Sequence, residues 1–187
     1  MLIHTEKAEI IIGRVPETND GIVWDCVEEL LNEGDSLRLL SREGLAVIPF
    51  KNLLEGQNAN KLKKCYYQNS DLQKWLNGEF LELYFNPEER VKIRAVTIPT
   101  IEEILKWFPE KISRVCTPSY YARENGADVY NSYNDAEACV YWLADTGRKA
   151  GMSATVVMAN GQIYKSAYLA ATNVCVRPVI EVFREEQ

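Results

Sequence analysis

The sequence has a single histidine, His4, among its 187 residues. Catalytic triads of the Ser-His-Asp and Cys-His types need an imidazole as general base, and a histidine this close to the terminus is poorly placed for that role. The glycine-rich phosphate-binding patterns GxxxxGKS/T and GxGxxG are also absent from the sequence. These absences argue against triad-type hydrolysis and against the common nucleotide-binding loops. We predict no catalytic residue and no cofactor.

Cysteine pairs with metal-ligand spacing are missing as well. None of the five cysteines forms a CxxC pair, whereas structural zinc sites use closely spaced ligands. The number of cysteines is odd and the first residues lack the pattern of a secretion signal, which favours reduced thiols over a disulfide framework. We therefore expect a cytoplasmic protein without a metal site. The cysteines are Cys26, Cys65, Cys116, Cys139 and Cys175.

No apolar run approaches the roughly 18 residues that would suggest a membrane-spanning helix. Lys and Arg number 21 against 27 Asp and Glu, a formal net charge of −6, so we do not expect the basic face that duplex nucleic acid requires. The composition, 47% hydrophobic and 26% charged, is typical of a globular chain. Length and composition predict one domain, residues 1–187, whose partner is neither a membrane nor duplex nucleic acid.

The first third of the chain contains short apolar runs. Residues 8–15 are rich in β-branched side chains and predict a strand. Residues 22–31 fit the strand and the helix patterns equally, so both stay open. Residues 36–40 and 45–49 predict the two strands of a hairpin.

Three helices are expected next, each with a capping signal. Ser70 or Asp71 caps the first, and Thr100 with Glu103 forms a capping box at the start of the second. Thr117, followed by a proline, predicts the start of the third. The apolar stripes of the first two helices indicate core packing. They comprise Leu72, Trp75, Leu76 and Phe80 in the first helix, and Ile101, Ile104, Leu105 and Phe108 in the second.

The remainder begins with a polar loop at residues 127–137, ADVYNSYNDAE. Strand patterns follow at residues 140–143 and 175–183, where Pro178 predicts an edge or a bulge. Asn160-Gly161 marks a hairpin between two further strands. Strands at both ends with helices grouped between them predict an α+β fold rather than alternating β/α units.

The polar loop carries the main candidate functional residues. Its oxygen ligands are of the kind that calcium takes, but their spacing lacks the regularity of an EF-hand and is typical of a solvated turn. Tyrosine suits a recognition surface because it gives a large contact area at low entropic cost, and we expect Tyr130 and Tyr133 to be exposed. The oxygen-ligand candidates are Asp128, Asn131, Asn134, Asp135 and Glu137.

Six segments occur in the order found in a bacterial family. They are IVW at 22–24, LRLLS at 37–41, NSDLQKWLN at 69–77, TPSYYA at 117–122, YWL at 141–143 and VRPV at 176–179. Over nearly the whole chain this series resembles the family called domain of unknown function 6273, whose pattern runs W…LLS…SxLRxWLN…TxYA…WWLRS…GVRPA. The chain departs from this pattern at Ala144 and Asp145, where the family has Arg-Ser, and at Cys175, where it has glycine.

That family is similar to C-type-lectin-like domains of the formylglycine-generating-enzyme and retroelement-variable-protein kind. The resemblance implies a single α+β domain with a small, twisted, mostly antiparallel sheet, flanking helices and a long irregular loop region that faces the ligand. The cysteine pair of the formylglycine-generating enzyme has no counterpart here, so its oxidase activity is not implied. Trp24, Trp75, Trp142 and Arg177 are expected to belong to the scaffold.

We therefore expect a non-enzymatic protein that binds another protein through the region 127–148, in the setting of a phage or mobile element acting on a host protein. One alternative is a cysteine- or metal-dependent enzyme, which requires two of Cys116, Cys139 and Cys175 to meet in an open pocket with a lowered thiol pKa. The other is a calcium-dependent, carbohydrate-binding lectin. The residues expected to bind are Tyr130, Tyr133, Asn134, Asp145 and Arg148.

Overall fold

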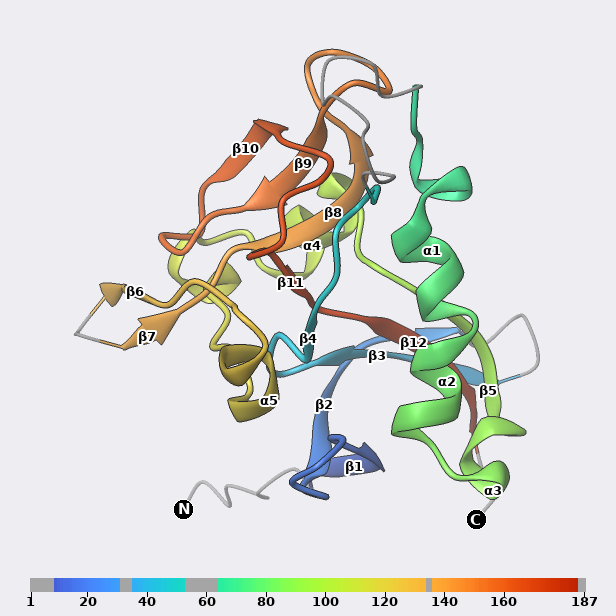
Figure 1. The fold of residues 1–187 in the computed structure, drawn as a ribbon. Coiled ribbons are helices and arrows are strands. Elements are labelled where there is room, and N and C mark those ends of the chain that lie inside the picture. The colour runs from blue at the N-terminus through green and yellow to red at the C-terminus, as the bar shows by residue number, and fades with distance from the viewer. Residues whose placement is uncertain (1–8, 31–34, 53–63, 134–135, 185–187) are drawn as a thin grey trace.

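The computed structural model describes residues 9–30, 35–52, 64–133 and 136–184. In this part of the chain, strands form two five-stranded sheets and one two-stranded hairpin, and short helices pack against the sheets (Figure 1). The fold is α+β, as predicted. The strands nevertheless build two sheets instead of the one small sheet that was expected.

The first sheet has the strand order β1-β2-β3-β12-β5, and every pair in it is antiparallel. The predicted strand over residues 8–15 is confirmed as β1, and the region that fitted both patterns forms the long strand β2. The strands are β1 (Ile10–Arg14), β2 (Gly21–Leu30), β3 (Ser36–Ser41), β12 (Val179–Phe183) and β5 (Ile93–Thr97).

The second sheet has the order β10-β9-β8-β11-β4, in which only the β11–β8 pair is parallel among the described strands. The predicted Asn160-Gly161 hairpin is confirmed, since β9 pairs with β10 and Gly161 has a φ of +76°. The strands are β10 (Ile163–Ala167), β9 (Ala154–Val157), β8 (Tyr141–Thr146), β11 (Cys175–Val176) and β4 (Ala46–Val47).

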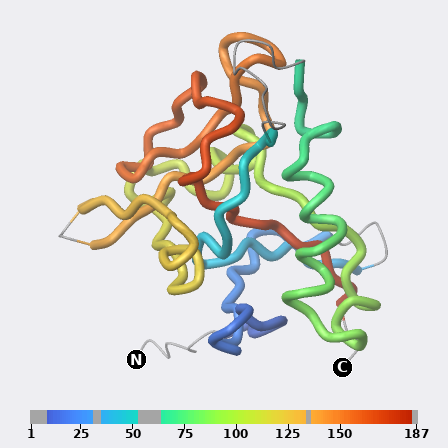
Figure 2. Tube along the Cα trace, in the orientation of Figure 1, coloured from blue at the N-terminus to red at the C-terminus, as the bar shows by residue number. Residues whose placement is uncertain are grey.

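Two segments of the chain, residues 41–46 and 176–179, run side by side from one sheet to the other, and we call this place the crossing. The predicted hairpin of β3 with β4 is wrong, because β3 pairs with β12 in the first sheet and β4 pairs with β11 in the second. The predicted single strand over 175–183 is likewise divided at Pro178. Across this crossing, Ser41 N donates to Pro178 O at 3.0 Å and Leu45 N donates to Val176 O at 2.8 Å. Figure 2 shows the two segments running together through the middle of the molecule.

The helices confirm two of the predicted caps. Ser70 accepts a hydrogen bond from Gln73 N at the start of α1, and Thr100 and Glu103 form the capping box of α4. The predicted cap at Thr117 is wrong, because Thr117 O accepts from Gly44 N and Ser119 caps α5 instead. The helices are η2 (Tyr67–Asn69), α1 (Asp71–Leu76), α2 (Glu79–Tyr84), α3 (Pro87–Arg90), α4 (Ile101–Trp107), η3 (Ile112–Arg114) and α5 (Tyr120–Glu124). None of the described helices is long and apolar enough to cross a membrane.

Each sheet contributes one face to each of two hydrophobic clusters. The larger cluster joins the sheets to α1 and α2, and the smaller joins their other faces to α4 and α5. The predicted scaffold role of Trp24 and Trp142 is confirmed: both are buried, and their indole nitrogens donate to Ile12 O at 2.8 Å and Ile48 O at 2.9 Å. Buried aromatic side chains thus hold the sheets in a fixed relation.

The Asn160-Gly161 turn provides a test of this packing. A Cβ atom at Gly161 would lie 1.8 Å from Lys111 O, in addition to the strain of its positive φ. Gly126 also has a positive φ, +98°, but the nearest atom to its Cβ would be Thr172 O at 3.9 Å. We expect Gly161→Ala to lower the free energy of unfolding in urea by at least about 3 kcal/mol, and Gly126→Ala by about 1 to 2 kcal/mol. Equal losses would contradict the close packing of the turn.

Candidate binding surface

The polar loop forms a short hairpin of β6 (Tyr130–Asn131) and β7 (Glu137–Ala138). Tyr130 and Tyr133 are 43% and 45% exposed, as predicted, although each hydroxyl has a partner. The Tyr130 hydroxyl donates to Asp128 Oδ2 at 3.0 Å, and that of Tyr133 donates to Asn160 O at 3.5 Å. The bond to the Asp128 carboxylate raises the pKa of Tyr130, so this phenol stays neutral. The ring surfaces remain available to a partner.

The hairpin is attached to its surroundings at three places. Ser132 Oγ donates to Ala159 O at 2.9 Å, beside the β9–β10 turn. Asp128 N donates to Asn173 O at 3.3 Å, and Thr117 Oγ1 donates to Glu137 O at 3.3 Å. Arg123 of α5 also forms an ion pair with Glu137. The described residues of the hairpin are therefore hydrogen-bonded to the surrounding structure.

The other predicted binding residues lie elsewhere. Asp145, near the end of β8, accepts a hydrogen bond from Ile101 N at 2.6 Å and thereby caps α4 a second time. Arg148 is exposed in the β8–β9 connection, at the top of Figure 1, whereas the β6–β7 hairpin is at the left. Asn134 is outside the described residues. Tyr130 and Tyr133 thus share the β6–β7 hairpin, whereas Asp145 belongs to β8 and Arg148 to the β8–β9 connection.

Two of the five predicted oxygen ligands of the loop are bound by protein groups. Asp128 accepts hydrogen bonds from Tyr130 and Asn173, and Glu137 pairs with Arg123. Among the described residues, no group of three or more His, Cys, Asp or Glu side chains is arranged to hold a metal ion. Asn134 and Asp135 lie outside that part of the chain.

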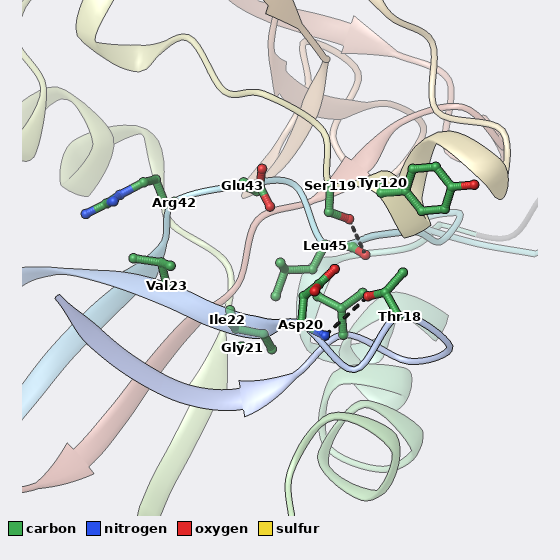
Figure 3. A pocket seen from close by; sticks show the side chains of 11 residues that line it. Thr18, Asp20, Gly21, Ile22, Val23, Arg42, Glu43, Leu45, Ser119 and Tyr120 are labelled. Carbon is green, nitrogen blue, oxygen red and sulfur yellow. Dashed lines mark hydrogen bonds between the residues drawn. The ribbon is translucent and has the colours of Figure 1, made fainter.

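A pocket of about 190 Å³ lies on the other side of α5 (Figure 3). Its apolar wall includes Val15, Ile22 and Leu45, which are buried members of the larger cluster. Its polar wall includes Asp20, Glu43, Ser119 and the 63%-exposed Tyr120. Ser119 Oγ donates to Leu45 O at 3.3 Å, so it joins α5 to the crossing segment that forms one side of the pocket.

Two carboxyl groups give this pocket its charge. Burial raises the pKa of Glu43, and the nearby Asp20 carboxylate raises it further against the opposing effect of Arg123 and Arg42. Figure 3 shows Arg42 pointing away from the pocket, where its guanidinium pairs with Asp25 at 3.1 Å and with Glu9 at 2.6 Å. The sequence did not reveal this site, because its wall comes from three separate segments and no local pattern joins them.

Three of the five thiols, those of Cys116, Cys139 and Cys175, lie close together beside Gly44 of the crossing. A Cβ atom at Gly44 would lie 3.1 Å from the Sγ atoms of both Cys139 and Cys175, and Cys116 pairs with Cys139 in an isolated β-bridge. All three side chains are buried. Burial raises the pKa of Cys116. Hydrogen bonding with Cys116 lowers the pKa of Cys139, but its bond with Cys175 and its burial together raise it well above the usual range. The open pocket and lowered pKa that thiol catalysis requires are not found at this cluster.

Thiol titration tests this arrangement. Cys26 is exposed, and the other four cysteines are buried. We expect the native protein to react rapidly with one equivalent of dithiobis(nitrobenzoate) and the denatured protein with five. The Cys26→Ser variant serves as the control and should show no rapid reaction when native. Rapid reaction of a second thiol in the native state would contradict the burial of the cluster.

Comparison with known proteins identifies one family. Residues 38–116, from β3 through α4 to Cys116, match the family model described as Domain of unknown function (DUF6273). The LRLLS and NSDLQKWLN motifs lie at or inside this segment, whereas YWL and VRPV lie beyond it. Searches of curated proteins and of solved structures returned no match. The match over residues 38–116 thus supports the resemblance to the family of domain of unknown function 6273 that the motifs indicate.

Proposed function

We propose that the protein is a non-enzymatic binding protein that recognises another protein through the β6–β7 hairpin. The observation that carries this proposal is the exposure of Tyr130 and Tyr133, together with Val129 at 41%, on a hairpin fixed at three places. Aromatic side chains are enriched in the energetically dominant parts of protein interfaces. A platform that is already ordered loses little conformational entropy when it binds.

We also propose that the scaffold is C-type-lectin-like. The family match over residues 38–116 supports this assignment, as do the mostly antiparallel strands, the flanking helices and the irregular region that displays the tyrosines. The buried reduced thiols fit a cytoplasmic location. A phage or mobile-element origin and a host protein as partner remain part of the proposal.

The two alternative functions receive no comparable support. A thiol-dependent enzyme would need an accessible, acidic thiol, whereas the converging sulfurs are buried and two of them have raised pKa values. A calcium-dependent lectin would need free oxygen ligands, whereas Asp128 and Glu137 are bound by neighbouring side chains.

Alanine variants test the hairpin. The partner is first captured from the native host by affinity purification, identified by mass spectrometry and purified. We then expect Tyr130→Ala and Tyr133→Ala each to weaken its binding by about 1 to 2 kcal/mol in calorimetry, with little change in thermal stability, because both rings are exposed.

Two further variants complete the design. Leu83→Ala removes a 58%-exposed apolar side chain from α2 and is the matched control, for which we expect no change in binding. Arg148→Ala shows whether the surface extends to the β8–β9 connection, and we expect no change there either. Unaltered binding of both tyrosine variants would overturn the placement of the interface.

A further inference from the structure

The pocket beside α5 combines an apolar interior with a negatively charged entrance. Val15, Ile22 and Leu45 supply the interior, and they are 6%, 2% and 1% exposed. Figure 3 shows Glu43 on the crossing segment above and Asp20 on the β1–β2 turn below, with Leu45 between them. A volume of about 190 Å³ is less than the roughly 300 to 1,000 Å³ of typical small-molecule sites. The pocket is therefore suited to one side chain.

Arg123 and Arg42 offset part of the negative charge of Glu43 from a distance, without forming a direct ion pair with it. No ion pair is formed by Asp20 or Glu43 in the part of the chain that the structure describes. The nearest cations are occupied elsewhere, since Arg42 pairs with Asp25 and Glu9, and Arg123 pairs with Glu137. The two carboxylates repel each other, so a cation placed between them would lower the free energy of both.

We propose that this pocket receives a lysine side chain of the partner protein. The methylene stem would lie against Ile22 and Leu45, and the ammonium group would donate to the carboxylates of Asp20 and Glu43. This inference rests on the proposed function, because the protein bound by the hairpin supplies the lysine. Helix α5 connects the two sites: Ser119 and Tyr120 line the pocket, and Arg123 contacts Glu137 of the hairpin.

Lysine fits this geometry better than arginine. Its ammonium group is a compact charge whose three donors point in different directions, so that it can serve carboxylates from two separate segments. The guanidinium group is a planar fork that favours one carboxylate held in its own plane. Tyr120 lies exposed at the rim of the pocket.

A titration with a lysine analogue tests the pocket without the partner. Nα-acetyl-lysine-N-methylamide is added to the ¹⁵N-labelled protein, and amide shifts are followed by NMR. We expect saturable shifts at Ile22, Leu45 and Tyr120, with millimolar affinity, and a lower pKa of Glu43 in the complex. The norleucine analogue has the same stem without the ammonium group and should cause no saturable shift. Absence of binding by the lysine analogue, or equal binding by norleucine, would overturn the proposal.

Isosteric variants test whether the carboxylates of Asp20 and Glu43 bind the ammonium group. We expect Asp20→Asn and Glu43→Gln each to weaken binding of the lysine analogue roughly two- to fivefold, the range of an exposed ion pair. Glu17→Gln changes an exposed acid of the same turn and should have no effect. Equal affinity of all three variants would contradict the assignment of the carboxylates, and tighter binding of the arginine analogue would contradict the choice of lysine.

The variants also separate this inference from the proposed function. If Tyr130→Ala weakens capture of the partner while Asp20→Asn and Glu43→Gln leave it unchanged, the hairpin is the interface and the lysine proposal is wrong. If the lysine analogue binds as described while the tyrosine variants capture the partner normally, the lysine proposal is confirmed and the proposed hairpin interface is wrong.

Discussion

The buried guanidinium of Arg177 holds the two sheets together at the point where the chain crosses between them. Its side chain is 3% exposed and lies between the rings of Phe108 and Tyr141. Its Nε donates to Ser41 O at 2.9 Å, and its Nη1 lies 3.4 Å from the Tyr141 hydroxyl. That hydroxyl in turn donates to Arg114 O at 2.9 Å. A charge this deeply buried is tolerated only when its donors find oxygens, so the guanidinium fixes both crossing segments at once.

The proposed binding surface is an extension of this crossing. Gly44, in the crossing segment, donates from its N to Thr117 O and accepts at its O from Ser119 N, both at 2.9 Å, which sets the start of α5. On one side of α5 the crossing forms the wall of the pocket, and on the other Arg123 reaches the hairpin. The buried thiols fill the space beneath Gly44 and serve as packing. The core thus positions both the hairpin and the pocket.

Local signals in the sequence predicted local features of the structure. Ser70, the Thr100–Glu103 box and Asn160-Gly161 act within a few residues of themselves, and each has its predicted role. The crossing was not predictable, because an apolar run followed by Arg42-Glu43-Gly44 also fits a hairpin, and only pairing with residues 175–183 decides between them. The exposure of Tyr130 and Tyr133 followed from their polar context. The pocket did not follow, because Asp20 and Glu43 belong to separate turns that only the tertiary structure brings together.

Native-state hydrogen exchange tests most directly whether this crossing is the rigid centre of the molecule. The amides of Ser41 and Leu45 donate across it to Pro178 and Val176, and the amide of Cys175 donates to Val140, next to β8. We predict that these three amides exchange only through global unfolding, with the denaturant dependence of the whole protein, while the amide of Tyr133 exchanges through local opening. Exchange of the crossing amides by local opening, at rates like that of Tyr133, would contradict a scaffold organised around Arg177.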